Sequence, residues 1–321
     1  MSFEPRTGKA ATATSDVVAW GFDMAATIDD RSLERVEDAL LDGFRARTTD
    51  GVDVIGFGET GVALSWPAGD GRLVLKRVTS FADQTEADEV AGDLQRYIDA
   101  IASHVTVVDT EIRTVVNRDG RVPLYLVQPR LAGESLVETI MDVDRPREGH
   151  PAVEAVVDVA LRASASGRLG VDAQFQNFAW RDGELVLFDV GTPMMFEPDG
   201  SYAFDTTAVR RVMPAFARGA AEKKFAEIVC DIGSRQGSLE QAAMSLVRVG
   251  QQRWLPVVLD LVNPHLDRPL DTEAVLERAQ HLHRQSGTLK RLMRLERWWS
   301  TQVRRRPYDM FITDSFSGEI L

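Results

Sequence analysis

The sequence predicts an α+β fold in which a small antiparallel sheet with one helix precedes a larger, mostly helical part. Three observations support this prediction. Short runs rich in Val, Ile and Leu, separated by turn residues, occupy much of residues 52–128. Helix-forming residues with apolar positions at helical spacing dominate residues 83–102 and 151–165. From residue 206 to about 306 the pattern is almost wholly helical and is interrupted only by glycines and prolines.

Composition and charge limit the classes of protein to consider. The chain has 321 residues, of which 44% are hydrophobic and 27% charged, so it can bury a sizeable core and is neither disordered nor fibrous. The single cysteine, Cys230, excludes an intrachain disulfide and a cysteine-based metal cluster, which fits a cytoplasmic protein. No signal peptide and no run of about 18 apolar residues is evident. A net charge of −12 argues against wholesale nucleic-acid binding.

The elements at the beginning of the chain follow from local pattern. Residues 1–15 are small and polar and predict a flexible tail. Residues 16–50 form a helical extension, because apolar side chains repeat at helical spacing after Ser32, namely at Leu33, Val36, Leu40, Leu41 and Phe44. We assign residues 51–130 to a sheet-containing lobe and residues 131–321 to a helical lobe.

Within the first lobe the strands and their helix can be placed in order. Residues 52–57, 61–66 and 72–78 predict an antiparallel meander, with the turn residues 67–71 between the last two strands. A helix over residues 83–102 follows. Residues 105–116 and 122–128 predict two further strands, giving about five strands around one helix. In the second lobe, Asp182 and Gly183 mark the turn of a short hairpin.

The first motif with chemical content is a glycine run. Residues 56–62 read GFGETGV, which we compare with the pattern G-x-G-x-x-G-x-V. Glycine allows the backbone to turn tightly and to approach phosphate oxygens. A dinucleotide-binding fingerprint requires a helix directly after the third glycine, whereas a strand and a hairpin turn follow here. The setting favours a loop that covers phosphates, although a plain hairpin turn would explain the glycines alone.

A lysine lies one hairpin beyond the glycines. Lys76 ends the apolar run Leu73–Leu75 and could contact the α- and β-phosphates of a nucleotide. Such a cation needs an acidic partner, for which the following helix offers Glu89 or Glu86. We prefer Glu89 because it is nearer the middle of the helix. Taken by itself, Lys76 would be interpreted as an ordinary edge-strand lysine.

The third motif contains the acidic residues. Asp172 and Asn177 have the D-x-x-x-x-N spacing of a kinase catalytic loop, and the strand-like run 184–188 then ends at Asp189-Val190-Gly191. Phosphoryl transfer requires a carboxylate that orients the attacking hydroxyl, and a second carboxylate with an amide oxygen that binds the metal. Each acidic residue alone would more often be a turn or helix-cap residue. The occurrence of all the motifs in order is much harder to obtain by chance.

With these motifs, the chain resembles the protein-kinase-like superfamily, and within it the bacterial aminoglycoside and choline kinase type. The resemblance covers residues 51–192 by motif, including PLYLVQPRLAGESL at 123–136, and the remainder by helical texture. It implies a two-lobed fold that binds ATP and Mg²⁺, with Asp172 as catalytic base and Asn177 and Asp189 as magnesium ligands. It also implies a set of nucleotide-contacting residues: Gly56, Gly58, Gly61, Val62, Lys76, Glu89, Gln128, Arg130 and Leu131.

Two departures from the family pattern bear on function. Gly170 and Val171 replace the His-Arg or His-Gly that usually precedes the catalytic aspartate, and that histidine normally braces the loop. No A-P-E element follows Gly191, which argues against a phosphorylated activation segment. We therefore expect an ATP- and Mg²⁺-dependent phosphotransferase acting on a hydroxyl of a small molecule. A nucleotide-binding pseudokinase that serves as a scaffold is the alternative.

A basic amphipathic stretch lies near the end of the chain. Residues 288–306 contain seven Lys or Arg residues and one Glu, interleaved with Leu, Trp and Val. Such a helix could make a weak contact with an anionic membrane, a nucleic acid or an acidic partner. We favour the interpretation that its Trp and Leu side packs against the protein while the arginines pair with surface carboxylates.

Overall fold

A five-stranded antiparallel sheet forms the first half of the molecule. The computed structural model describes residues 27–58, 61–69, 71–204, 206, 213–305 and 308–313. The strand order is β1-β2-β3-β6-β5, and every neighbouring pair is antiparallel. The strands are β1 (Val54–Phe57), β2 (Val62–Trp66), β3 (Leu73–Phe81), β6 (Val122–Pro129) and β5 (Glu111–Thr114). The predicted meander of the first three strands is therefore correct.

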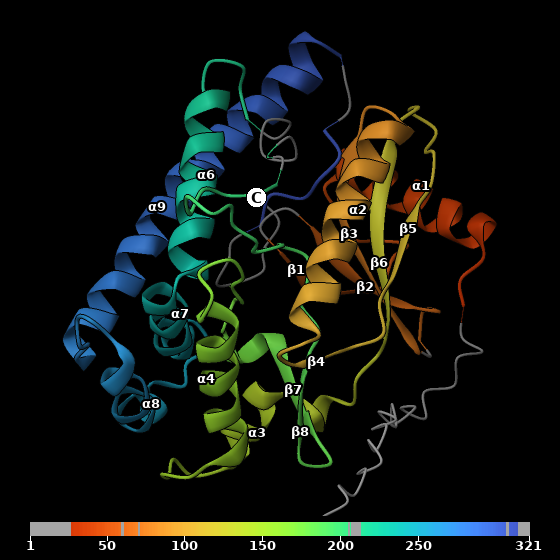
Figure 1. Cartoon of the computed structure of the whole chain (residues 1–321). Coiled ribbons are helices and arrows are strands. Elements are labelled where there is room, and N and C mark those ends of the chain that lie inside the picture. The colour runs from red at the N-terminus through yellow and green to blue at the C-terminus, as the bar shows by residue number, and fades with distance from the viewer. Residues whose placement is uncertain are drawn as a thin grey trace, which may run out of the picture.

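Two helices cover opposite faces of this sheet. Helix α1 (Asp30–Ala46) packs its apolar stripe against one face, which includes Leu75 and Val127. Helix α2 (Gln84–Ile101) packs against the other face, which includes Leu124 and Leu126. Because successive side chains along a strand point to opposite faces of the sheet, alternate residues of each strand pack against α1 and against α2. Both helices appear beside the sheet in Figure 1.

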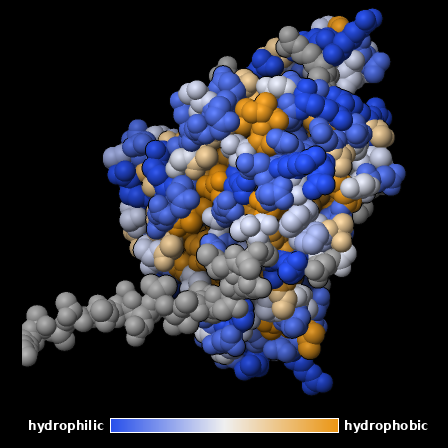
Figure 2. Space-filling model, turned by 90° about the vertical axis from the view of Figure 1, so that its right-hand side faces the viewer, coloured by the Kyte–Doolittle hydropathy of each residue, from blue (hydrophilic) through white to orange (hydrophobic). Residues whose placement is uncertain are grey.

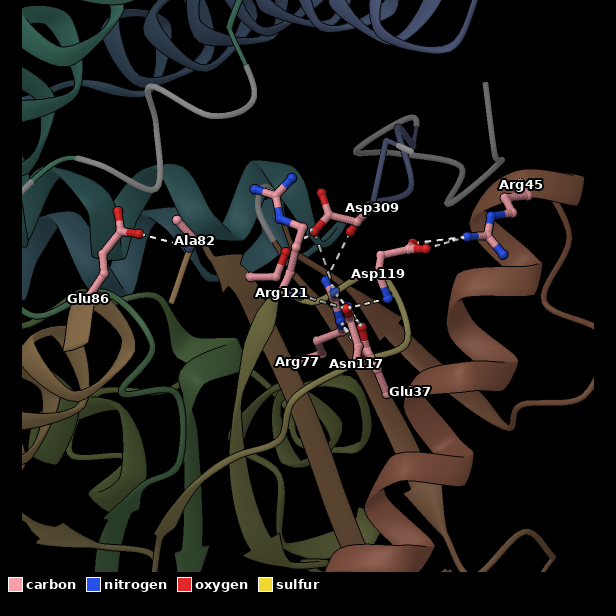
Figure 3. Close-up of polar contacts among 10 residues, drawn as sticks. Glu37, Arg45, Arg77, Ala82, Glu86, Asn117, Asp119, Arg121 and Asp309 are labelled. Atoms are coloured by element: carbon pink, nitrogen blue, oxygen red, sulfur yellow. Dashed lines mark hydrogen bonds and ion pairs between the residues drawn. The ribbon is translucent and has the colours of Figure 1, made fainter. Parts of the chain in front are cut away.

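A buried ion pair fixes α1 on the sheet. Arg77 of β3 donates to Glu37 of α1 through Nε at 2.7 Å and Nη2 at 2.9 Å, and both side chains are almost fully buried. Glu37 also accepts from Tyr125 at 2.5 Å and from Asn117 at 3.0 Å, and Arg77 donates to the backbone oxygen of Asp309 at 2.9 Å. Figure 3 shows Glu37, Arg77, Asn117 and Asp309 converging from four distant parts of the chain. Buried charged groups are stable only when they have ion-pair and hydrogen-bond partners such as these.

A small second sheet lies between the two halves. Its order is β4-β8-β7, with β7 (Phe178–Arg181) and β8 (Glu184–Leu187) forming the hairpin expected at residues 182–183, and β4 (Thr106–Val107) parallel to β8. The prediction of one strand over residues 105–116 is wrong. That segment is divided because β4 pairs with β8 whereas β5 pairs with β6, and the amide of Val108 donates to Leu187 between them.

Helices form the remainder of the molecule, as predicted, and gather on one side of Figure 1. The α-helices are α3 (Val137–Val143), α4 (Pro151–Ser164), α6 (Arg218–Gly233), α7 (Arg235–Arg248), α8 (Leu255–Val262) and α9 (Thr272–Trp298). Short turns of helix are η1 (Gly133–Ser135), η2 (Phe175–Asn177), η3 (Gln252–Trp254), η4 (Asn263–His265) and the π-type η5 (Trp299–Val303). Trp254, fully buried, donates its indole N–H to Met141 at 3.0 Å and ties α3 to the helical core.

The coarse prediction of an α+β fold, with an antiparallel sheet first and helices second, is confirmed. The predicted tail at residues 1–15, and the part of the helical extension before residue 27, lie outside the described residues. None of the described helices combines the length and the apolar character that crossing a bilayer requires. On the face that Figure 2 presents, hydrophobic residues form small patches separated by hydrophilic ones.

Candidate functional site

Lys76 and Asp189 meet where the five-stranded sheet faces the helical half. Along β3, Leu75 and Arg77 face α1, so Lys76 projects from the other face of the sheet. Asp189 lies two residues beyond the end of β8, and its Oδ1 forms an ion pair with the ammonium of Lys76. Two predicted site residues that are 113 positions apart are thus in direct contact.

Gly191 allows this approach. A Cβ at position 191 would lie 3.0 Å from the Nζ of Lys76 and 3.2 Å from its Cε. The amide of Gly191 also donates to Oδ1 of Asp189 at 3.2 Å. The D-x-G sequence therefore supplies both a carboxylate and the space that the lysine occupies beside it.

The ion pair keeps Asp189 charged. Burial alone would raise the pKa of this carboxyl group, but the charge of Lys76 and its hydrogen bond, with the Gly191 amide, lower the pKa below its ordinary value of 3.8. Asp189 is therefore an anion at neutral pH, which is the form that binds a divalent cation.

The segment before β7 presents a second carboxylate. Val171, Ala173 and Phe175 are buried in the core, and the residues between them face outward and are partly exposed. Oδ2 of Asp172 accepts from Nε2 of Gln174 at 2.6 Å. Its Oδ1 is buried and has no hydrogen-bond partner within the described part of the chain. Asp172 thus has one oxygen oriented by Gln174 and one buried oxygen whose hydrogen-bonding capacity is unused.

Asp172 has an environment suited to proton transfer. Burial is the main cause that raises its pKa from 3.8 to about 6, and the negative charge of Asp189 adds to this effect. The hydrogen bonds from Gln174 and Asn177 oppose the shift without cancelling it. A carboxylate with a pKa near neutrality is a stronger base than an ordinary aspartate and is still ionised at pH 7.

Three side chains hold the backbone around Asp172. Tyr97 of α2 donates to the carbonyl of Gly170 at 3.2 Å, Ser238 of α7 donates to Val171 at 2.8 Å, and Asn177 donates to Asp172 at 3.0 Å. Three consecutive carbonyls are therefore fixed from three different elements. This arrangement does the bracing that the sequence pattern assigns to a histidine at this place. The sequence does not predict a role for Tyr97 or Ser238, because no local pattern shows that their helices pack on this loop.

Asn177 lies between Asp172 and Asp189 in the sequence. It is buried, and the amide of Phe188 donates to its backbone oxygen at 3.1 Å, which ties it to the segment between β8 and Asp189. Because its Nδ2 is directed at the Asp172 carbonyl, its Oδ1 is the atom left to bind a cation. The described residues contain no cluster of three or more His, Cys, Asp or Glu side chains that could hold a metal. Mg²⁺ does not require one, since it commonly takes one or two protein ligands together with phosphates and water.

The glycine run forms the connection between β1 and β2. Gly56 on β1 pairs with Ala63, and the amide of Gly58 donates to Gly61 at 2.9 Å; Glu59 and Thr60 lie outside the described residues. A Cβ at Gly61 would lie 2.5 Å from the carbonyl oxygen of Arg77, so only glycine fits there without a shift. The run is thus a strand-to-strand turn, as predicted, and does not lead into a helix.

The prediction that Val62 contacts a nucleotide is wrong. Val62 pairs with Arg77 and is buried in the core formed with α1, on the face of the sheet away from Lys76. Ala63, which pairs with Lys76, is the residue on the lysine side. The error has a simple origin, because the valine of G-x-G-x-x-G-x-V stands two places after the last glycine, where this chain has Ala63.

The acidic partner of Lys76 differs from the one expected. Glu89 is exposed on α2, and the ion pair that Lys76 forms within the described residues is with Asp189. Glu86 accepts from the backbone amide of Ala82 at 2.8 Å (Figure 3). Ala82 directly precedes Asp83, the N-cap residue of α2. Glu86 and Asp83 thus form a reciprocal cap at the start of α2.

The residues expected to face adenine surround the end of β6. Gln128 is buried and donates to Thr110 at 3.0 Å and to the carbonyl of Phe188 at 2.9 Å, so its side chain links β6 to the segment before Asp189. Arg130 donates to Ser65 at 3.1 Å. Leu131 packs on a small apolar cluster that includes Phe188. Gln128 and Leu131 thus lie beside the segment that leads to Asp189, and the contact of all three residues with adenine stays a prediction.

The interpretation favoured for the basic stretch is wrong for its last turns. Leu292 and Met293 do pack against the protein. The side chains beyond them are largely exposed, with fractions of 42–53%: Leu295, Trp298, Trp299 and Val303. The Trp side of this helix is therefore not covered by the described residues.

Comparison with known proteins gives a family but no activity. The model of a family of unknown function, DUF6206, matches residues 36–297. This match covers α1 from residue 36 onward, both sheets, and the helical part to the penultimate residue of α9. No curated protein matches the chain.

Proposed function

The chain belongs to the DUF6206 family, and we propose that it is a kinase-like phosphotransferase that uses ATP and Mg²⁺ to phosphorylate a hydroxyl of a small molecule. The observation that carries this proposal is the meeting of Lys76 with Asp189 close to a second, proton-accepting carboxylate, Asp172. The order of the sheet and the turn at Gly56–Gly61 support a protein-kinase-like interpretation of the fold.

In this proposal each residue has a distinct task. Lys76 neutralises phosphate charge, and the glycine turn covers the phosphates with backbone amides. Asp189 and Asn177 hold Mg²⁺, which supplies charge neutralisation for the transferred phosphoryl group. Because Lys76 already pairs with Asp189, nucleotide phosphates would compete with this carboxylate for the ammonium.

Asp172 receives the proton. The substrate hydroxyl oxygen forms a bond to the terminal phosphorus of ATP, the bond from that phosphorus to ADP breaks, and the hydroxyl proton passes to the carboxylate of Asp172. Gln174 orients this carboxylate through Oδ2, and Oδ1 is buried with no hydrogen-bond partner among the described residues. A pKa of about 6 leaves the group ionised at pH 7 and basic enough to take part.

A nucleotide-binding pseudokinase is the second candidate. Two observations favour it, namely the absence of a histidine before Asp172 and the exposure of Glu89, which forms no ion pair with Lys76 among the described residues. Against it, the hydrogen bonds from Tyr97, Ser238 and Asn177 hold the Asp172 loop without a histidine. We therefore favour the enzyme.

Calorimetry of Mg-ATP binding tests the metal assignment. We expect Asp189→Ala to weaken Mg-ATP binding at least about tenfold, since a charge-assisted contact contributes on the order of 1.5–3 kcal/mol. Asp158→Ala, which removes an exposed carboxylate on α4, is the control and should leave the affinity unchanged. Equal affinity of Asp189→Ala and the parent protein would discredit the assignment.

Turnover separates the two candidates. The protein is incubated with ATP, Mg²⁺ and a broad panel of hydroxyl-bearing metabolites, and ADP release is followed with product detection. Transfer that Asp172→Asn abolishes, with nucleotide affinity retained, supports the enzyme. Nucleotide binding without transfer to any acceptor supports the scaffold.

A further inference from the structure

A cavity between the end of α1 and the end of α9 gathers arginines. Its volume is about 300 Å³, and it is lined by Arg47, Arg294, Arg297, Trp298, Thr301 and Gln302. None of these residues belongs to the Lys76–Asp189 site. In Figure 1, α9 crosses the helical half and α1 lies on the sheet, so the cavity joins the two halves of the molecule.

The three guanidinium groups have no carboxylate partner within the described part of the chain, whereas Arg278, earlier on α9, pairs with Asp231 and Glu240. Arg297 is only 9% exposed, and burying such a charge is unfavourable unless a counter-charge approaches it. Burial, together with the nearby charges of Arg47 and Arg294, lowers the pKa of Arg297. A chain with a net charge of −12 thus concentrates positive charge in one hollow.

The positions of these arginines are fixed by the backbone. Arg47 ends α1 in the left-handed conformation, with φ of 59°, which is a place that glycine usually takes. Arg294 and Arg297 are three residues apart and therefore share one face of α9. Trp298, half exposed, adds an aromatic surface at the rim.

We propose that this cavity binds the phosphoryl group of a multiply charged anion. Arginine is suited to this task because its planar fork makes paired hydrogen bonds to phosphate oxygens. Thr301 and Gln302 add a hydroxyl and an amide at the same cavity. The volume accommodates a phosphoryl group with a small attached moiety. The same chemistry is offered by a free phosphorylated metabolite and by the headgroup of an anionic lipid, and the experiment below separates these sources.

Inorganic pyrophosphate, titrated into the full-length protein by calorimetry, is the first probe. We expect Arg294→Gln, Arg297→Gln and Arg47→Gln each to weaken binding about tenfold, as the loss of a charge-assisted hydrogen bond predicts. Arg291→Gln is the matched control, because it removes one exposed arginine from the same helix outside the cavity, and it should change the affinity less than about twofold. Because pyrophosphate could also bind at the proposed nucleotide site, the titrations are repeated in a Lys76→Met background, where the weakening by the three cavity variants should persist.

The second probe is sedimentation with vesicles of phosphatidylcholine containing or lacking phosphatidic acid. Vesicle binding that Arg294→Gln and Arg47→Gln abolish, and that Arg291→Gln does not, identifies a lipid headgroup as the source. Arg47 lies on a different element from Arg297, so a folding defect of the buried variant cannot imitate the result. Absence of binding to both probes, or equal weakening by Arg291→Gln and Arg294→Gln, would overturn the proposal.

Discussion

At the scale of single residues, the most important feature is the difference between the electrostatic surroundings of Asp189 and Asp172. Asp189 is compensated by Lys76 and the Gly191 amide, and its pKa is lowered. Asp172 receives only neutral donors at one oxygen, and its pKa is raised to about 6. Neighbouring carboxyl groups whose pKa values are driven apart in this way are suited to different roles, one for binding a cation and one for moving a proton.

The raised pKa of Asp172 predicts a trade-off between stability and activity. Because its pKa is higher in the folded state than the ordinary 3.8, the stabilisation it gives is fully present below pH 3.8 and is lost as pH rises through about 6. A gap of this size corresponds to at most about 3 kcal/mol. We expect Asp172→Asn to abolish transfer and yet to raise the free energy of unfolding at pH 7.5 by about 1–3 kcal/mol.

Urea unfolding at pH 4 and pH 7.5 checks this expectation. The gain from Asp172→Asn should shrink at pH 4, where the native carboxyl group is largely protonated. Asp158→Asn, on the exposed surface of α4, should stay within about 0.5 kcal/mol at both pH values. In the parent protein, kcat/KM should rise with pH around an apparent pKa near 6. A variant that is less stable at pH 7.5 would contradict the burial argument.

At the scale of elements, the Asp172 loop depends on a close contact with α6. A Cβ at Gly170 would lie 2.5 Å from the Cα of Gly233 and 2.6 Å from its carbonyl oxygen, so the two backbones touch. This contact explains why the sequence has glycine where the protein-kinase-like pattern that it resembles has histidine. There is no room for a side chain at position 170, and Tyr97 braces the loop from α2 instead.

Gly170→Ala is therefore expected to destabilise the protein by about 1–3 kcal/mol, the usual effect of overpacking a close contact. Gly92→Ala is the matched control, because Gly92 is exposed in the middle of α2 and a Cβ there meets nothing within 4 Å. That change should be stabilising by about 0.5–1 kcal/mol. Thermal unfolding followed by circular dichroism distinguishes the two, and equal effects would show that the contact at Gly170 is unimportant.

The elements also show which parts of the fold can be predicted from a sequence. Helices α1, α2 and α4 and the first three strands follow from local periodicity, because their apolar spacing reflects the face they bury. The division of residues 105–116 between two sheets depends on pairing with β8, which is distant in sequence, and no local pattern reports it. The meeting of Lys76 with Asp189 was predictable from ordered motifs, whereas the braces at Tyr97 and Ser238 depend on helix packing.

At the scale of the whole molecule, the last described segment, residues 308–313, packs against α1 and β1, which come early in the chain. Phe311 packs edge-on against Phe44 of α1 at 4.6 Å between ring centroids and against Phe57 of β1 at 5.7 Å. Asp309 accepts from Ser80 and lies 3.7 Å from the guanidinium of Arg77. Since Phe57 immediately precedes Gly58, the segment that contains Phe311 supports the strand that leads into the glycine turn.

Phe311→Ala should therefore affect both stability and nucleotide binding. Truncation of a buried phenylalanine costs about 3–5 kcal/mol, and the loss of its support should loosen β1 and weaken Mg-ATP binding several-fold. Phe216→Ala is the matched control, because Phe216 is 77% exposed and its removal should change the stability by less than about 0.5 kcal/mol. Urea unfolding and calorimetry measure the two quantities separately. Reduced stability with unchanged Mg-ATP affinity would show that the contact of Phe311 with Phe57 does not support the glycine turn.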